Sequence, residues 1–167
     1  MADEAELQAE LHAMRQNGLA DELATAAKAA DIPVAFFYGI ASRETNCTNE
    51  LGDYEGGEYH GVGIVQIDIQ HDIARQARDS GSWKTDPAPL IAFGANLLAE
   101  GMQAVRVHCP GYTDEQVLKV AASGYNAGIM TAIDDSQTRG DSDASTTGGD
   151  YGADVVARMH AFERLLA

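Results

Sequence analysis

The feature of this sequence that most constrains its fold is an apolar run that begins at Pro33 and ends at the charged pair Arg43-Glu44. Proline suits the first turn of a helix, because its fixed φ angle is already helical and that position needs no N–H donor. The large apolar side chains of the run recur at helical spacing. A helix that is apolar around most of its circumference is buried, so we expect this one to lie in the core.

Glu44 is the strongest catalytic candidate because it ends that helix. A carboxylate at the end of a buried helix is costly to ionise, so we expect its pKa to rise. A carboxylic acid that is still protonated near neutral pH is what cleavage of a glycosidic bond requires. Most glutamates are simply solvated carboxylates, so the assignment depends on the residues around Glu44.

Helical periodicity continues through most of the chain. It predicts helices over about residues 3–16, 21–30, 86–107 and 113–125, and a last helix marked by apolar residues from Val155 to Leu166. The Gly-rich stretch 52–63 breaks this period, and the alternation around it predicts short strands with a turn. Residues 129–133 add a helical turn. Residues 134–149, rich in Asp, Ser, Thr and Gly, are predicted to form a flexible loop.

Length and charge limit the classes of protein to which the chain can belong. With 167 residues, it is expected to form one domain, residues 1–167. No apolar run reaches membrane-spanning length, and the acidic N-terminus lacks the basic and apolar regions of a signal peptide. The net charge of −15 argues against binding to nucleic acid or to an anionic membrane surface.

Two cysteines, Cys47 and Cys109, are too few for a disulfide framework. One bridge between them and two separate semi-buried thiols both remain open at this point. Neither cysteine has a second Cys or a His at zinc-finger spacing, so no metal site is expected. The glycines lack the Gly-Lys pairing of a phosphate-binding loop.

Five short stretches, taken in order, resemble the goose-type lysozymes, the family 23 glycoside hydrolases, whose lysozyme-like fold is shared with the lytic transglycosylases. They are Ser42-Arg-Glu44, Gly52-Asp53, Gly61-Val-Gly-Ile-Val-Gln-Ile-Asp68, Tyr125-Asn-Ala-Gly128 and Asp150-Tyr-Gly-Ala-Asp-Val-Val-Ala-Arg158. Any one of them alone is a weak signal, but five in family order are a strong one. The resemblance implies a mainly α (α+β) lysozyme-like fold, helical with a small β element near the cleft.

The resemblance also implies catalytic roles for three carboxyl groups. Glu44 matches the general acid, and Asp53 and Asp68 match the pair that positions and activates a water on the opposite face of the sugar, as an inverting mechanism requires. Each aspartate alone would pass for an ordinary turn or cap residue. The stretch from Asp53 to Gly61 is longer than the spacing usual in the family.

Five further residues match substrate-binding positions of the family. Gln66 lies two residues before Asp68, which would place both side chains on the same face of a strand. The others are His71, Tyr125, Asn126 and Tyr151. Tyrosine offers a flat apolar face for a sugar ring together with a hydroxyl group.

The resemblance implies a monomeric muramidase that needs no cofactor. Its substrate would be bacterial peptidoglycan, with chitooligosaccharides as small substrates, and it would act outside the cell or on the cell wall. Two alternatives remain: a lytic transglycosylase, which releases 1,6-anhydro-muramic acid products, and a non-catalytic peptidoglycan-binding module. Transglycosylases typically lack the pair that Asp53 and Asp68 form, and a binding module would not need Glu44.

Overall fold

The computed structural model describes residues 3–167, which form nine α-helices and two small antiparallel sheets. The helices are α1 (Glu4–Gln16), α2 (Leu19–Ala29), α3 (Val34–Thr45), α4 (Asp72–Ser80), α5 (Ser82–Thr85), α6 (Ala88–His108), α7 (Asp114–Ala127), α8 (Ile129–Thr138) and α9 (Tyr151–Leu166). The strands are β1 (Tyr54–Glu55), β2 (Glu58–Tyr59), β3 (Gly61–Val62) and β4 (Ile67–Asp68), and a short 3-10 helix covers Thr147–Gly149. This architecture confirms the mainly α fold class with a small β element.

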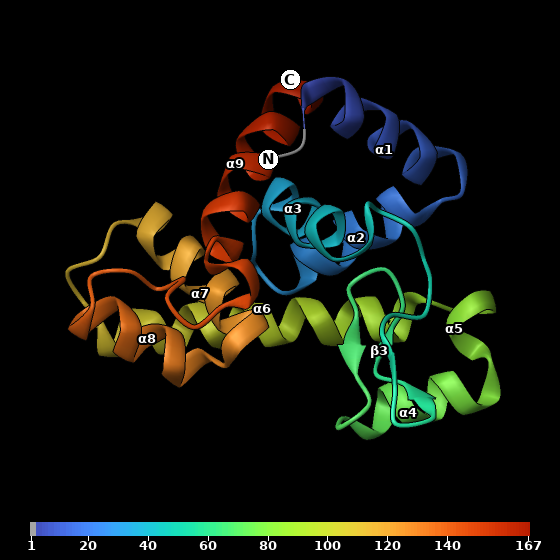
Figure 1. The fold of residues 1–167 in the computed structure, drawn as a ribbon. Helices are drawn as coiled ribbons and strands as arrows, with labels where there is room; N and C mark the ends of the chain where they lie inside the picture. The colour runs from blue at the N-terminus through green and yellow to red at the C-terminus, as the bar shows by residue number, and fades with distance from the viewer. Residues whose placement is uncertain (1–2) are drawn as a thin grey trace.

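Helix α3 lies in the core, as its apolar run predicts, and packs along α9 (Figure 1). Its side chains Phe36, Phe37 and Ile40 are fully buried. The two helices approach closely at Gly39, where a Cβ atom would lie only 2.8 Å from the backbone oxygen of Val155 in α9. The absence of a side chain at this position therefore sets the distance between the helix that carries Glu44 and its main partner.

Helix α6 runs lengthwise beneath this pair in Figure 1, with α7 and α8 toward one end and the strands, α4 and α5 toward the other. The expected helix over residues 113–125 begins at a capping box, in which Thr113 accepts from the backbone N–H of Gln116 and the Gln116 side chain accepts from Thr113 N–H. Helices α4 and α5 were not predicted: α4 buries only the small side chains of Ala74 and Ala77, and α5 has only four residues.

The two sheets place Asp53 and Asp68 beside the same residue. Gly61 pairs with Asp68 across the β3–β4 hairpin, and its carbonyl accepts a hydrogen bond of 2.9 Å from Gly52 N–H, next to Asp53. The backbone N–H of His60 donates to the Asp53 carbonyl at 2.9 Å, closing the base of the β1–β2 hairpin. The longer spacing before Gly61 is thus taken up by this hairpin, and Asp53 stays at its base.

The prediction of a flexible loop over residues 134–149 was wrong for its first residues, because α8 continues to Thr138. The following segment is held by the buried carboxylate of Asp143, which accepts from the backbone N–H of Gly152 at 2.6 Å and of Ala153 at 3.0 Å. Helix N-termini leave such N–H groups without intrahelical partners. A polar segment whose only apolar residue is the exposed Ala144 is therefore held in place by capping α9.

Both cysteines are free and buried, Cys47 just after α3 and Cys109 just after α6. The structure thus favours two separate thiols over a disulfide. The thiol of Cys47 donates a weak hydrogen bond of 3.5 Å to Glu10 in α1. Burial, followed by the charge of Glu10, raises the pKa of this thiol, so it packs as a small neutral side chain.

Candidate active site

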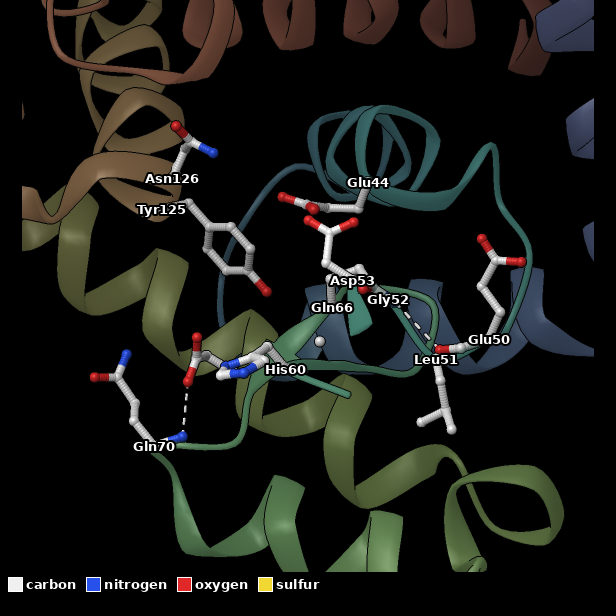
Figure 2. Close-up of a pocket in the computed structure, with 12 residues that line it drawn as sticks. Glu44, Glu50, Leu51, Gly52, Asp53, His60, Gln66, Gln70, Tyr125 and Asn126 are labelled. Carbon is white, nitrogen blue, oxygen red and sulfur yellow. Dashed lines mark hydrogen bonds between the residues drawn. The ribbon is translucent and has the colours of Figure 1, made fainter. Parts of the chain in front are cut away.

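A cleft of about 620 Å³ opens between the end of α3, the two hairpins and the end of α7 (Figure 2). Its lining is mostly polar and combines side chains from segments distant in sequence. These are Glu44, Glu50, Leu51, Gly52, Asp53, His60, Gly61, Gln66, Asp68, Gln70, Tyr125 and Asn126. Six of the eight residues singled out from the sequence therefore share one cavity, which is the arrangement that a catalytic site requires.

Glu44 lies in the last turn of α3 and is half-buried at the edge of this cleft. Burial is the largest influence on its carboxyl group and raises its pKa above the ordinary value; the negative charge of Asp53 adds to the rise. A hydrogen bond from Tyr151 and the positive charge of Arg43 act in the opposite direction. The net effect is a carboxyl group that holds its proton to higher pH than an exposed glutamate.

Asp53 and Asp68 line the same cleft, and both are exposed. Figure 2 shows the Asp53 carboxylate pointing toward Glu44, which agrees with its effect on the Glu44 pKa. Asp68 ends β4, and its Oδ1 accepts a hydrogen bond of 2.7 Å from the backbone N–H of Gln70. That bond fixes the Asp68 carboxylate in a turn and leaves its second oxygen for other partners.

Gln66 lines the cleft, but the expectation that it shares a strand face with Asp68 was wrong. It lies in the turn between β3 and β4 with a φ of +49°, a conformation uncommon outside glycine. Its Nε2 donates to the carbonyl of Gly63 at 2.8 Å and to that of Glu50 at 3.2 Å. The side chain packs against Gly52 and Gly61, where any Cβ atom would collide with it. Gln66 therefore joins the two loops that form the cleft floor.

Tyr125 and Asn126 end α7 and line the cleft from the opposite side, as Figure 2 shows. The Tyr125 hydroxyl donates to the carbonyl of Val65 at 2.7 Å, and burial raises its pKa, so it stays a neutral donor. The Asn126 Oδ1 accepts from the backbone N–H of Thr147 at 2.8 Å. This bond turns the amide nitrogen of Asn126 toward the cleft, where it can donate to a ligand.

His71 lies in a second hollow of about 500 Å³, which shares Gln70, Tyr125 and Asn126 with the first. Its ring packs against Phe93 with the centroids 4.9 Å apart. These two neighbouring hollows together make up the groove of the candidate site. His71 therefore lies along the groove but away from the three carboxyl groups.

Tyr151 does not line either hollow, contrary to its expected place among the substrate-binding residues. It is the first residue of α9, it is buried, and its hydroxyl donates a short hydrogen bond to Glu44 Oε1. Burial raises the pKa of this hydroxyl well above its usual value, so it remains a donor. The structure thus places Tyr151 behind the acid.

Three residues near the site had no predicted role. Glu50 and His60 line the cleft, and Arg43 binds two carboxylates at the start of α9, beside Tyr151. Of these three, only Arg43 could have been singled out from its position in the chain, because it directly precedes the acid. Among residues 3–167, no group of three or more His, Cys, Asp or Glu side chains could hold a metal ion, and no helix is long and apolar enough to cross a membrane.

Comparison with known proteins identifies the family of the chain. The family model described as Lysozyme g matches residues 5–165. A lysozyme g of Epinephelus coioides is 35% identical over 139 residues, which cover 79% of this chain and 68% of the relative. For a lysozyme g of Takifugu rubripes, the identity is 28% over 156 residues, or 93% and 79% of the two chains. One from Casuarius casuarius is 31% identical over 130 residues, or 78% and 64%. The chain therefore belongs to the lysozyme g family of glycoside hydrolases.

Proposed function

We propose that this protein is a muramidase that hydrolyses the β-1,4 bond between N-acetylmuramic acid and N-acetylglucosamine in peptidoglycan, with inversion at the anomeric carbon. The observation that carries the proposal is the pair formed by Glu44 and Asp53. Burial raises the pKa of one carboxyl group, and an exposed carboxylate of the same cleft points toward it. Two carboxyl groups in different environments are the arrangement from which glycosidases derive an acid and a base.

Glu44 would donate its proton to the glycosidic oxygen as the bond to the anomeric carbon breaks. The acid then becomes a carboxylate, and two neighbours are placed to stabilise that charge. The Tyr151 hydroxyl already donates to Glu44 Oε1, and Arg43 contributes a positive charge. Both groups interact more strongly with the carboxylate than with the neutral acid, so both favour proton transfer.

Asp53 and Asp68 would hold the attacking water on the opposite face of the sugar. The water attacks the anomeric carbon while one of these carboxylates takes its proton, and the product carries the inverted configuration. The arrangement of the two hairpins supports this role. Gly61 pairs with Asp68 and accepts a hydrogen bond from the residue before Asp53, so both aspartates lie at the same part of the cleft floor. The turn that engages one oxygen of Asp68 would keep that carboxylate in a fixed orientation.

The groove would bind the glycan strand on both sides of the scissile bond. Asn126 offers an amide donor, Tyr125 offers an aromatic face, and His71 and Gln66 extend the lining. Chitooligosaccharides, which repeat the N-acetylglucosamine unit, would be small substrates for the same groove. The enzyme would act as a monomer on the cell wall or outside the cell.

The proposal is tested with Glu44→Gln, which preserves the shape of the side chain but removes the acidic proton. General acid catalysis contributes roughly 10²–10⁴-fold, so turnover of peptidoglycan should fall by that factor while chitooligosaccharide binding persists. Glu115→Gln, which removes an exposed carboxylate of α7 outside the cleft, is the matched control and should retain turnover. Retention of more than about a tenth of the activity by Glu44→Gln would contradict the assignment of the acid.

The products distinguish the reaction classes. A hydrolase releases a reducing muramic acid end, and nuclear magnetic resonance of fresh digests should show the inverted anomer. A transglycosylase would release an anhydro sugar, which is lighter by one water. A binding module would release nothing, and a retained anomer would exclude the inverting mechanism.

A further inference from the structure

Arg43 connects the end of α3 to the start of α9. Its Nη2 donates to Asp150 Oδ1 at 2.9 Å, and its Nη1 donates to Asp154 Oδ2 at 3.0 Å. Asp150 directly precedes α9, and Asp154 lies in its first turn. The planar guanidinium suits this double contact, because its N–H groups point in fixed directions. Only 24% of the Arg43 side chain is exposed, so the ion pairs are partly shielded from solvent.

The same guanidinium lies over the ring of Tyr151, with its central carbon 5.5 Å from the ring centroid. This distance is within the range of a cation–π contact. The Tyr151 hydroxyl in turn donates to Glu44 Oε1. One side chain thus pairs with two carboxylates at the start of α9 and also lies over the ring that contacts the acid.

Asp154 is fixed from a second side by Arg158. The Arg158 Nε donates to Asp154 Oδ2 at 2.7 Å, and its Nη1 donates to the hydroxyl of Ser42 at 2.7 Å. Ser42 is buried and directly precedes Arg43, and its own hydroxyl donates to Glu10 in α1. The carboxylate that binds Arg43 is therefore held in place by a buried network that returns to α3. Such networks keep a side chain in one rotamer, which a single exposed ion pair does not.

We propose that Arg43 is a positioning residue for catalysis. Asp150 and Asp154 hold its guanidinium over the Tyr151 ring. The ring is thereby fixed where its hydroxyl orients the Glu44 carboxyl group for proton donation. This inference rests on the proposed role of Glu44 as the general acid. Misorientation of an acid by a fraction of an ångström weakens proton transfer without removing the substrate-binding groups. Loss of Arg43 should therefore lower kcat and leave KM nearly unchanged.

The charge of Arg43 gives a second, independent signature. The groups that face Glu44 are Tyr151 from α9, Tyr125 from α7, Asp53 from the hairpin base and Arg43 from α3 itself. Asp150 and Asp154 face Arg43 and offset part of its charge. Because the positive charge lowers the pKa of Glu44, its removal should raise that pKa further. The basic limb of the kcat profile, where the acid loses its proton, should move to higher pH.

The experiment compares Arg43→Met, Arg43→Lys and Arg106→Met on a neutral chitooligosaccharide over a range of pH. Methionine keeps an unbranched side chain of similar length without charge, whereas lysine keeps the charge without the planar fork. Arg106 lies on α6 with 48% of its side chain exposed, and its distance to Asp114 is 3.8 Å. Arg106→Met therefore gives the same change in net charge away from the site.

Arg43→Met should lower kcat by about 10- to 100-fold, with KM within about twofold of wild type, and should shift the basic limb upward. Arg43→Lys should restore the position of the limb and part of kcat. Arg106→Met should leave both unchanged. The inference would be overturned if Arg43→Met kept the wild-type kcat and the wild-type position of the basic limb. Equal effects of Arg43→Met and Arg106→Met would overturn it as well.

If Arg43→Met fails to fold, Asp150→Asn provides a second test, because the Asp150 side chain is 56% exposed and the substitution weakens one of the two ion pairs that hold Arg43 while the guanidinium charge stays beside the site. This variant should lower kcat by a smaller factor than Arg43→Met, and the basic limb of its pH profile should not move to higher pH. An unchanged kcat would contradict the positioning role of Arg43. Failure of the underlying assignment is separate: it is seen as activity retained in Glu44→Gln. An inactive Glu44→Gln beside an unaffected Arg43→Met would reject only the role of Arg43.

Discussion

Glu44 has to meet two opposing requirements of catalysis. The environment of the acid must disfavour its charge before the reaction, yet the acid must exist as a carboxylate after proton transfer. Burial meets the first requirement, and the hydroxyl of Tyr151 and the charge of Arg43 meet the second. A group whose pKa is raised on folding contributes stability that is fully present below its unfolded pKa and lost as the pH rises through its folded pKa. Glu44 should therefore reduce stability at neutral pH.

We predict that Glu44→Gln stabilises the protein at neutral pH. Glutamine is never ionised, so it avoids the cost of placing a charge at this site. Below about pH 4.3, the unfolded-state pKa of glutamate, both proteins carry a neutral side chain and the difference should vanish. Urea unfolding at pH 4 and at pH 7 measures it, with Glu50→Gln as the control for net charge. A less stable Glu44→Gln at neutral pH would show that contacts of the carboxylate outweigh its desolvation.

The active site depends on one pair of elements more than on any other. Helix α3 carries Glu44 at its end, and α9 begins with Tyr151, so the spacing between these helices decides whether the acid and the hydroxyl meet. Gly39 and Val155 set that spacing through their close backbone approach. The cap that Asp143 provides fixes the start of α9 in the same way. Geometry at the acid is thus an outcome of helix packing.

We predict that Gly39→Ala lowers both stability and activity. Its Cβ would lie 2.8 Å from the Val155 oxygen, and a backbone atom cannot move aside without shifting α9. Overpacking of this kind typically costs about 1–3 kcal/mol. Gly101→Ala in α6 is the matched control, since its Cβ would meet only ordinary contacts, the nearest at 3.5 Å. It should be neutral or stabilising by roughly 0.5–1 kcal/mol. Equal effects of the two substitutions on thermal unfolding would contradict this account.

Over the whole molecule, the excess of acidic residues governs how the enzyme meets a charged substrate. The net charge of −15 arises from 26 acidic and 11 basic residues. Some acidic side chains lie in local ion pairs, such as Asp154 with Arg43 and Arg158, but most acidic side chains are exposed to solvent. Repulsion from an anionic cell wall would extend over a Debye length of roughly 30 Å at 0.01 M salt and about 8 Å at 0.15 M.

We predict that moderate salt raises activity on whole cells, because screening weakens the repulsion between the protein and anionic wall polymers. Salt should also raise stability by reducing repulsion among the acidic side chains. On a neutral chitooligosaccharide, the salt effect on the rate should nearly vanish. Rates on both substrates from low to physiological salt provide the measurement. Equal salt curves, or a steady fall on cells, would show that surface charge does not control access.

The sequence by itself determined the elements whose causes are local. The period of 3.6 residues predicted the main helices, the Thr113 capping box marked the start of α7, and the glycines marked the hairpins. The apolar run predicted that Glu44 would end a buried helix, and the raised pKa agrees. The two aspartates and the Tyr125-Asn126 pair were found by motif, and they do line the same cleft as Glu44.

Tertiary structure alone decided which side chains touch the acid. Tyr151 and Glu44 are 107 positions apart, and their contact exists only because α3 and α9 pack closely. Gln66 follows an alternating pattern, yet its contacts with two distant glycines hold it in a turn. The polar segment after α8 folds around Asp143 because unpaired N–H groups of α9 lie beside it. Local periodicity carries no information about such partners, since the energy that selects each conformation comes from groups that only folding brings together.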